Sequence, residues 1–429
     1  MPALLRAAAA LLLVAARAAA LPQPQAQAPP AATPIFIPSA RYPCFRQPAI
    51  LAVGAKLLAF AENRNVSACA PEAAETRHPD EVGSMLLRIS ADAGATWEPM
   101  KEVPGTVGNI DFYSVVFDAK AKKVTLLLQD RGVAVLSSVD AGASWTTEAP
   151  LDLEGLSKGA IQLSKPAVGH GIQIQPQLCP GGCKNAGRLI VPMVCTNKTA
   201  SGSHGDRGCV TCNSCLLLSD DSGKTWSLGA VGQQGTRESQ VVQLPSSGAT
   251  AALYATERNM GAHPGHRQYA FSMDGGDTFA ITGTDATLTG PVTAHWTGIV
   301  GSVNGILGNL AGGASTLVYS GPASTSMRQD MSIHTSANGG RSWSAGKTLW
   351  AGFAGYVSHF RLPAPLPSVP ALSSGPQFWP NSGLDAHDEA LPAACCLLPR
   401  PAFRHSDLGV HCWVCHSLTS QRARTATVW

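Results

Sequence analysis

Six cysteines gathered between positions 179 and 215 have a spacing that could serve either metal binding or crosslinking. They are Cys179, Cys183, Cys195, Cys209, Cys212 and Cys215. The pattern Cys209-x2-Cys212-x2-Cys215 would suit zinc if the side chains were thiolates. An exported chain with 12 cysteines instead favours disulfides. We therefore predict a disulfide-stapled loop without metal, although the sequence leaves the pairing open. The tract His411-x3-Cys415-His416 lies in irregular sequence, and we attribute its metal-like spacing to chance.

A second candidate for chemistry is the arginine of Phe45-Arg46-Gln47-Pro48, which stands directly before an apolar run. A guanidinium offers two parallel N–H donors that match a carboxylate, and it stays protonated in proteins. Because a single arginine is more often a surface side chain, it is the place of Arg46 relative to the strands and repeats that makes this segment the earliest candidate for a binding site.

The element that must position such groups is an eight-residue turn that occurs five times. Each copy combines an Asp or Asn that bonds nearby N–H groups, a Gly suited to positive φ and a terminal aromatic anchor. The central positions are separated by 48 to 81 residues, which fits one four-stranded blade per repeat with loop insertions. The copies are Ser90–Trp97, Ser138–Trp145, Ser219–Trp226, Ser272–Phe279 and Ser336–Trp343.

Short apolar runs without helical periodicity precede or separate these turns, and they predict an all-β protein. We expect a six-bladed β-propeller over residues 35–360, with an incomplete last blade if the chain ends as printed. The predicted strand runs are 49–53, 56–60, 85–89, 124–128, 133–136, 189–194, 215–218, 251–255 and 316–319.

The remaining segments lie outside this repeat region. Residues 1–20 have the basic start, apolar run and small-residue exit of a cleaved signal peptide, with an uncleaved anchor as the alternative. Residues 21–34 form a Pro/Gln/Ala-rich linker, and residues 361–429 form an irregular tail without strand alternation. A net charge of +3 without basic clusters argues against nucleic acid as a partner.

Together, Phe-Arg-x-Pro and the Asp-type repeats resemble the sialidases, over residues 35–360. The stretch Leu57–Arg64 makes the lysosomal-type animal sialidases the most similar group. The resemblance implies an exo-α-sialidase that releases terminal sialic acid from glycoproteins, glycolipids and oligosaccharides with retention and without a cofactor.

The resemblance also implies roles for individual residues. Arg46, Arg258 and Arg328 correspond to the arginine triad that grips the substrate carboxylate, while Glu62 neutralises Arg46 and Arg64 lines the same pocket. Tyr356 corresponds to the nucleophile, Glu238 to its base and Asp80 to the acid/base residue, with the neighbouring Glu81 as the alternative. A phenol has a pKa of about 10 and needs such a base.

Two other functions remain open from the sequence. One is a catalytically inactive propeller that binds sialoglycans or proteins. The other is a hydrolase for a related 2-keto sugar acid, since arginines recognise only the carboxylate. The signal segment and the cysteines predict passage through the secretory pathway, with the lysosome, the extracellular space or a membrane-associated location as destinations. The choice of the lysosome and a protective serine carboxypeptidase as partner are implied by the resemblance alone.

Overall fold

The chain divides into two units, Met1–Pro30 and Ala31–Trp429. The first unit, with the predicted signal segment, lies outside the described residues. The computed structural model describes the second unit over residues 34–64, 83–106, 108, 112–130, 132–179, 181–200, 209, 211–260, 265–289, 302–306, 316–325, 329–353, 357–361, 411–418 and 426–428. Among these residues, none of the helices has the length and apolarity that crossing a bilayer would require.

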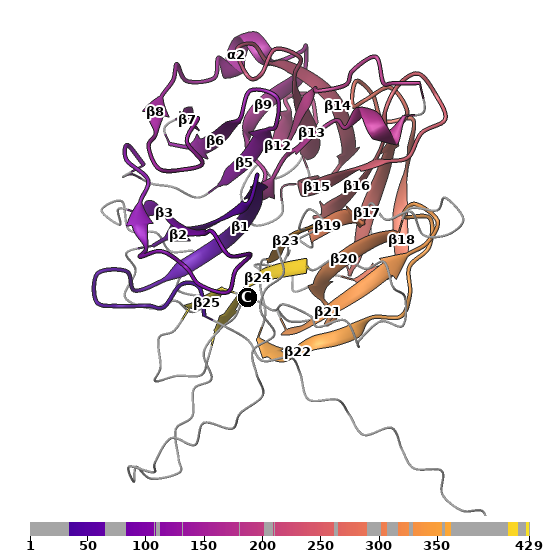
Figure 1. Ribbon diagram of the computed structural model, residues 1–429. Helices are drawn as coiled ribbons and strands as arrows, with labels where there is room; N and C mark the ends of the chain where they lie inside the picture. Colours follow the sequence, from indigo (N-terminus) through magenta and orange to yellow (C-terminus); the bar gives the residue numbers. More distant parts are fainter. Residues whose placement is uncertain are drawn as a thin grey trace, which may run out of the picture. The chain divides into compact units, whose positions relative to one another are not determined.

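The predicted apolar runs all fall in strands, and the strands form six sheets (Figure 1). The first three sheets contain β1 (Phe45–Val53), β2 (Lys56–Asn63), β3 (Ser84–Ser90) and β4 (Lys101–Glu102); β5 (Tyr113–Asp118), β6 (Lys123–Gln129), β7 (Val133–Ser138), β8 (Thr146–Thr147) and β10 (Gly169–His170); and β9 (Ile161–Pro166), β11 (Ile172–Gln173), β12 (Leu189–Asn197), β13 (Cys212–Ser219) and β14 (Ser227–Gln234). The described helices are α2 (Leu153–Leu156) and the 3₁₀ turn η1 (Pro176–Leu178).

The last three sheets continue the series in chain order. They contain β15 (Thr236–Leu244), β16 (Ala252–Asn259), β17 (His266–Ser272) and β18 (Ile281–Thr289); β19 (Ser302–Ile306), β20 (Thr316–Pro322), β21 (Gln329–Ser336) and β22 (Lys347–Phe353); and β23 (Val357–Arg361), β24 (His411–Leu418) and β25 (Ala426–Val428).

The sheets close into a ring through their innermost strands. Strand β1 contacts β5, β5 contacts β12, and the series continues through β15, β19 and β23 back to β1 (Figure 1). This is an all-β propeller, as predicted. The number of blades is a correction, because the described chain shows five sheets of four or five strands rather than six full blades. The sixth sheet has three strands.

Two strands of that sixth sheet, β24 and β25, lie in the tail for which the sequence predicted no strands. Strand β24 pairs antiparallel with β23, and β25 pairs with β24. Residues His411–Leu418 are rich in cysteine and histidine, so they lack the alternation of apolar and polar residues that identifies a strand from sequence.

The five repeated turns fold alike, each joining the last two antiparallel strands of one of the five fuller sheets. In the first, the Ser90 hydroxyl accepts the Gly94 N–H at 2.8 Å, and Asp92 accepts the backbone and hydroxyl of Thr96 at 2.8 and 2.6 Å. Three more turns repeat this pattern with Asp, and Asn338 takes the place of Asp in the fifth, where its amide instead donates to Ser342.

The aromatic residue that ends each turn packs into the core beneath it. Trp145 contacts the cluster shared by the first two sheets, and Trp226 contacts the cluster shared by the second and third. Phe279 and Trp343 repeat this between later sheets. The predicted anchoring role is therefore confirmed, and four of the five aromatic residues pack between their own sheet and the one before it, whereas Trp97 packs within the first sheet.

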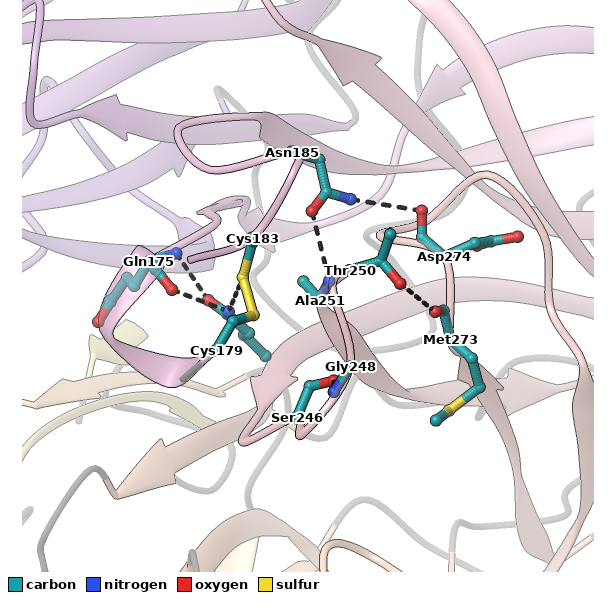
Figure 2. The surroundings of a disulfide bond; sticks show 11 residues. Gln175, Cys179, Cys183, Asn185, Ser246, Gly248, Thr250, Ala251, Met273 and Asp274 are labelled. Atoms are coloured by element: carbon teal, nitrogen blue, oxygen red, sulfur yellow. Dashed lines mark hydrogen bonds between the residues drawn. A yellow bond between two sulfur atoms is a disulfide. The ribbon is translucent and has the colours of Figure 1, made fainter. Parts of the chain in front are cut away.

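The six clustered cysteines form disulfides, as predicted. The pairs are Cys179–Cys183, Cys195–Cys215 and Cys209–Cys212. Figure 2 shows that the loop carrying Cys179–Cys183 lies against the neighbouring sheet. There Asn185 accepts from Ala251 N–H and donates to the Asp274 carbonyl, both at 3.3 Å. The insertion thus joins the third sheet to the repeated turn of the fourth.

Candidate active site

The first group of predicted site residues lies on β1 and β2. Arg46 faces Glu62 across the two strands, and the register shifts directly after Arg46. Gln47, at the shift, has φ +50°, which is rare for a side-chain-bearing residue and marks a strained bulge. Glu62 is fully buried, and Arg64 Nε donates to its Oε1 at 2.7 Å. The bulge therefore sets a buried carboxylate among arginines at the start of the first sheet.

The second group lies on β15 and β16. Glu238 is fully buried and sits at another register shift, with φ +43°. Its Oε1 is 2.6 Å from Arg258 Nη1 and 3.3 Å from Arg237 Nη2. Burial alone would raise the pKa of Glu238, but Arg258, Arg237 and then Lys165 hold the pKa below its ordinary value. Glu238 is therefore a carboxylate at neutral pH.

Two consecutive residues at the start of β5 connect these groups. The ring of Phe112 lies 5.3 Å from the Arg237 guanidinium carbon and 3.9 Å from Lys165 Nζ. The hydroxyl of Tyr113 donates to the Gln47 carbonyl, beside Arg46. Burial, followed by the charge of Glu62, raises the Tyr113 pKa well above its usual range. Tyr113 is thus a neutral structural phenol, and Phe112–Tyr113 contacts both strained bulges.

Strand β23, which begins one residue after Tyr356, meets the first sheet close to this region. Ser358, on β23 two residues after Tyr356, accepts the Ile50 N–H at 3.2 Å and lies 3.3 Å from His170 Nδ1 on β10. Ser358 is fully buried. Ile50 lies on β1, which also carries Arg46, and His170 lies on β10, which pairs with β5. The chain just after Tyr356 therefore lies beside a strand of the first group.

Four predicted residues, Asp80, Glu81, Arg328 and Tyr356, lie outside the described residues. The described chain resumes at Gly83, which forms an antiparallel bridge with Gly108. A Cβ at Gly83 would stand 2.6 Å from the Asn63 carbonyl oxygen, so only glycine fits this close approach. Of the predicted residues that the structure describes, Arg46, Glu62 and Arg64 lie together in one group, and Glu238 and Arg258 lie together in another.

Sequence reasoning missed four residues that contact these groups. They are Phe112, Tyr113, Lys165 and Arg237. Arg237 had a local signal, since it directly precedes Glu238, whereas the other three come from separate strands and carry no motif. Within the described ranges, no group of three or more His, Cys, Asp or Glu side chains is arranged to hold a metal.

Comparison with known proteins agrees with this architecture. Residues 112–362 match the family model of the BNR repeat-like domain. A curated sialidase of Micromonospora viridifaciens is 25% identical over 312 residues, which cover 65% of this chain and 43% of that protein. The chain therefore spans less than half the length of the curated relative it matches.

Solved sialidase structures superpose on the same fold. The Hadza microbial sialidase Hz136 has a TM-score of 0.55 at 19% identity, over 73% of this chain and 60% of that one. The NanB sialidase from Streptococcus pneumoniae has a TM-score of 0.57 at 14% identity, over 80% and 67%. The family model of the BNR repeat-like domain covers more than half of the chain, which also has five repeated turns and a closed ring of sheets. The chain therefore belongs to the BNR repeat-like domain family and shares the propeller fold of the sialidases.

Proposed function

We propose that this protein is a retaining exo-α-sialidase that hydrolyses terminal sialic acid from glycoproteins, glycolipids and oligosaccharides. One observation carries the proposal. Phe112–Tyr113 contacts both the bulge beside Arg46 and the Arg237–Glu238 segment, so arginines and a buried glutamate from two distant sheets are linked through one short segment. In a propeller, such groups converge on the axis, where a ligand binds.

In this proposal the substrate carboxylate is bound by Arg46, Arg258 and Arg328. Sialic acid carries its carboxylate on the carbon that undergoes substitution, and guanidinium groups stabilise it through paired, permanently charged donors. The side chains of Glu62 and Glu238 offset the repulsion among these cations, as the contacts of Arg64 and Arg258 illustrate. A positive surplus near the site favours anionic substrates.

The nucleophile in this proposal is Tyr356, with Glu238 as its base. Glu238 Oε1 is engaged by arginines, while Oε2 is buried and makes no hydrogen bond within the described part of the chain. That oxygen is suited to accept the phenol proton as the phenol oxygen attacks the anomeric carbon. A neutral phenol avoids the repulsion that a carboxylate nucleophile would meet from the substrate carboxylate. Tyrosine nucleophiles are an accepted exception to the two-carboxylate scheme.

Asp80 completes the scheme as acid/base, with Glu81 as the alternative. It protonates the departing glycosidic oxygen as the bond to the phenol forms. It then takes a proton from the water that cleaves the aryl glycoside bond to Tyr356, while Glu238 returns its proton to the departing phenol oxygen. This regenerates Tyr356 and releases sialic acid with its original configuration.

The experiment is turnover of a fluorogenic sialoside by purified protein, with Tyr356→Phe as the variant and Tyr42→Phe as the matched control. Loss of the attacking oxygen should lower kcat by about a thousandfold or more. Binding of a sialic acid analogue, measured by calorimetry, should persist. Equal turnover by Tyr356→Phe and the parent protein would remove the nucleophile from this proposal.

Two alternatives are decided by the same assay. A binding module without catalysis would bind the sialoside without releasing fluorophore, and a hydrolase for a related 2-keto sugar acid would cleave the glycoside of that acid in preference to the sialoside.

We also propose that the repeated turns are Asp boxes, and that the protein enters the secretory pathway and reaches the lysosome, where it is bound to a serine carboxypeptidase. Cell fractionation and co-purification test that placement.

A further inference from the structure

The end of β12 carries an N-glycosylation sequon that has no part in the candidate active site. Asn197, Lys198 and Thr199 form the pattern Asn-x-Thr, in which the middle residue is any but proline. A glycan on such an asparagine is bulky and hydrophilic, so a folded protein accommodates it only at the surface. The place of these three residues in the fold therefore decides whether the sequon can carry a glycan.

The backbone of the sequon is fixed by hydrogen bonds to segments next to the strands of the third sheet. The Asn197 N–H donates to the Thr211 carbonyl, just before β13, at 2.9 Å. The Lys198 N–H donates to the Ala160 carbonyl, just before β9, at 2.9 Å. Asn197 is the last residue of β12, and the Ala200 N–H donates to its carbonyl at 3.3 Å. The sequon thus occupies a tight turn at the point where β12 ends.

The side chains of this turn lie at the surface in a form that is compatible with glycosylation. Lys198 and Thr199 are exposed, and Asn197 is half-buried. Asn197 Oδ1 accepts the Thr199 hydroxyl at 2.8 Å and the Thr199 N–H at 3.0 Å. Within the described residues, the hydrogen bonds of the Asn197 side chain use Oδ1 and not Nδ2, the atom to which a glycan is linked. Because a glycosylated amide keeps its carbonyl oxygen, a glycan on Nδ2 leaves both contacts intact.

Two disulfides next to the sequon point to the compartment in which this part of the chain matures. Cys195–Cys215 joins β12 to β13, and Cys209–Cys212 encloses Thr211, whose carbonyl holds the first residue of the sequon. These four cysteines are at most 6% exposed. Disulfides form and persist in oxidising compartments such as the lumen of the endoplasmic reticulum, where asparagine-linked glycans are also added. The same segment therefore carries both a surface acceptor and the crosslinks typical of that compartment.

We propose that Asn197 carries an N-linked glycan. The transfer joins Nδ2 to the anomeric carbon of the first sugar and breaks the bond between that carbon and a lipid-linked diphosphate donor. One proton leaves Nδ2, and the lipid diphosphate is released. This modification goes beyond the proposed catalysis: it rests on the proposed entry into the secretory pathway and not on cleavage of any sialoside.

The test is expression of the full chain in human cells, once with its own N-terminus and once behind the signal peptide of a secreted protein. Peptide N-glycosidase F in water labelled with 18O converts each glycosylated asparagine to a labelled aspartate, which peptide mass spectrometry locates. The label should appear at Asn197 in both proteins. An unlabelled Asn197 behind the added signal peptide would overturn the inference. If the label appears only behind the added signal peptide, the proposed secretory entry fails while the glycan at Asn197 stands.

Variants of the sequon, expressed behind the added signal peptide, provide a second readout. Asn197→Gln removes the acceptor amide and Thr199→Ala removes the required hydroxyl, so both should lose one glycan and migrate faster on denaturing gels. Thr199→Ser keeps a sequon and should keep the glycan, as should Lys198→Ala, the matched control at the middle position. Faster migration of Lys198→Ala, or parent-like migration of Asn197→Gln, would contradict the assignment. A second sequon, Asn65-Val66-Ser67, lies outside the described residues, and mass spectrometry reads its peptide separately.

Discussion

The two strained residues, Gln47 and Glu238, give the clearest link between backbone and chemistry. Both occupy positive φ at register shifts on the innermost strands of their sheets. Such conformations cost roughly 1–3 kcal/mol each and persist where the surroundings enforce them. Tyr113 holds the first bulge by its hydrogen bond, and Arg258 holds the second by its ion pair. The strain therefore falls on Glu238 itself and on the residue that follows Arg46, both within the proposed site.

Glu257, the neighbour of Arg258, behaves in the opposite way and gives a prediction about pH. It is fully buried, and burial raises its pKa to about 7, although Ser214 and Arg267 act to lower it. Because the folded-state pKa lies above the unfolded value, the folded protein binds an extra proton between pH 4.5 and 7. Unfolding free energy should then decline by about 3 kcal/mol as the pH rises through that window.

Glu257→Gln should flatten this decline, since glutamine cannot lose a proton. Chemical denaturation at pH 4.5, 6 and 7.5 measures the effect, with the exposed Glu98→Gln as control. A parent protein that is equally stable at pH 4.5 and 7.5 while the variant matches it at both would disprove the assignment.

At the level of single elements, the repeated turns were predicted in full because their chemistry is local. A Ser, an Asp and a Gly within five positions specify the hydrogen bonds without help from distant residues. The strands that contain a short apolar run, such as β6 and β12, were predicted for the same reason, whereas strands with more polar sequence, such as β15 and β18, were not. The surroundings of Glu238 were not predicted, because Lys165 and Arg237 meet the Phe112 ring only after three sheets have closed around one axis. Strand β24 was missed because its sequence, rich in cysteine and histidine, does not alternate between apolar and polar residues.

Ser219 tests the contribution of one turn. Its buried hydroxyl accepts the Gly223 N–H at 2.8 Å and donates to Asp221 at 2.9 Å. Ser219→Ala leaves that buried N–H without its acceptor, so the unfolding free energy should fall by about 1–3 kcal/mol. Thermal and urea denaturation measure this, with exposed Ser227→Ala on the same hairpin expected to change little. An effect no larger than that of the control would show that the turn does not depend on its serine.

For the molecule as a whole, closure of the ring depends on contacts between the first and last sheets. Ile50 and Ser358 are separated by 308 positions, yet the Ile50 N–H donates to the Ser358 hydroxyl. Sialidase relatives reach the same ring at 14–19% identity, so the fold tolerates wide variation provided that the sheets close. In this chain closure also brings the residues next to Tyr356 beside β1.

Ser358→Ala should therefore affect both stability and activity. Loss of the hydroxyl removes the acceptor of the buried Ile50 N–H, so unfolding free energy should fall by about 1–3 kcal/mol. Because Tyr356 lies two residues away, kcat toward a sialoside should fall more than KM changes. Exposed Ser247→Ala is the control. A destabilised variant with unaltered kcat would separate ring closure from the placement of the nucleophile.

The central claim is that Tyr356 forms a covalent bond with the anomeric carbon of a sialic acid. A 3-fluorosialosyl fluoride forms such an intermediate and slows its breakdown, and peptide mass spectrometry of the treated protein locates the added sugar. The account predicts one added sialosyl group on the peptide that contains Tyr356, and none in Tyr356→Phe. Turnover of sialosides by a protein that carries the label on another residue, or on none, would contradict it.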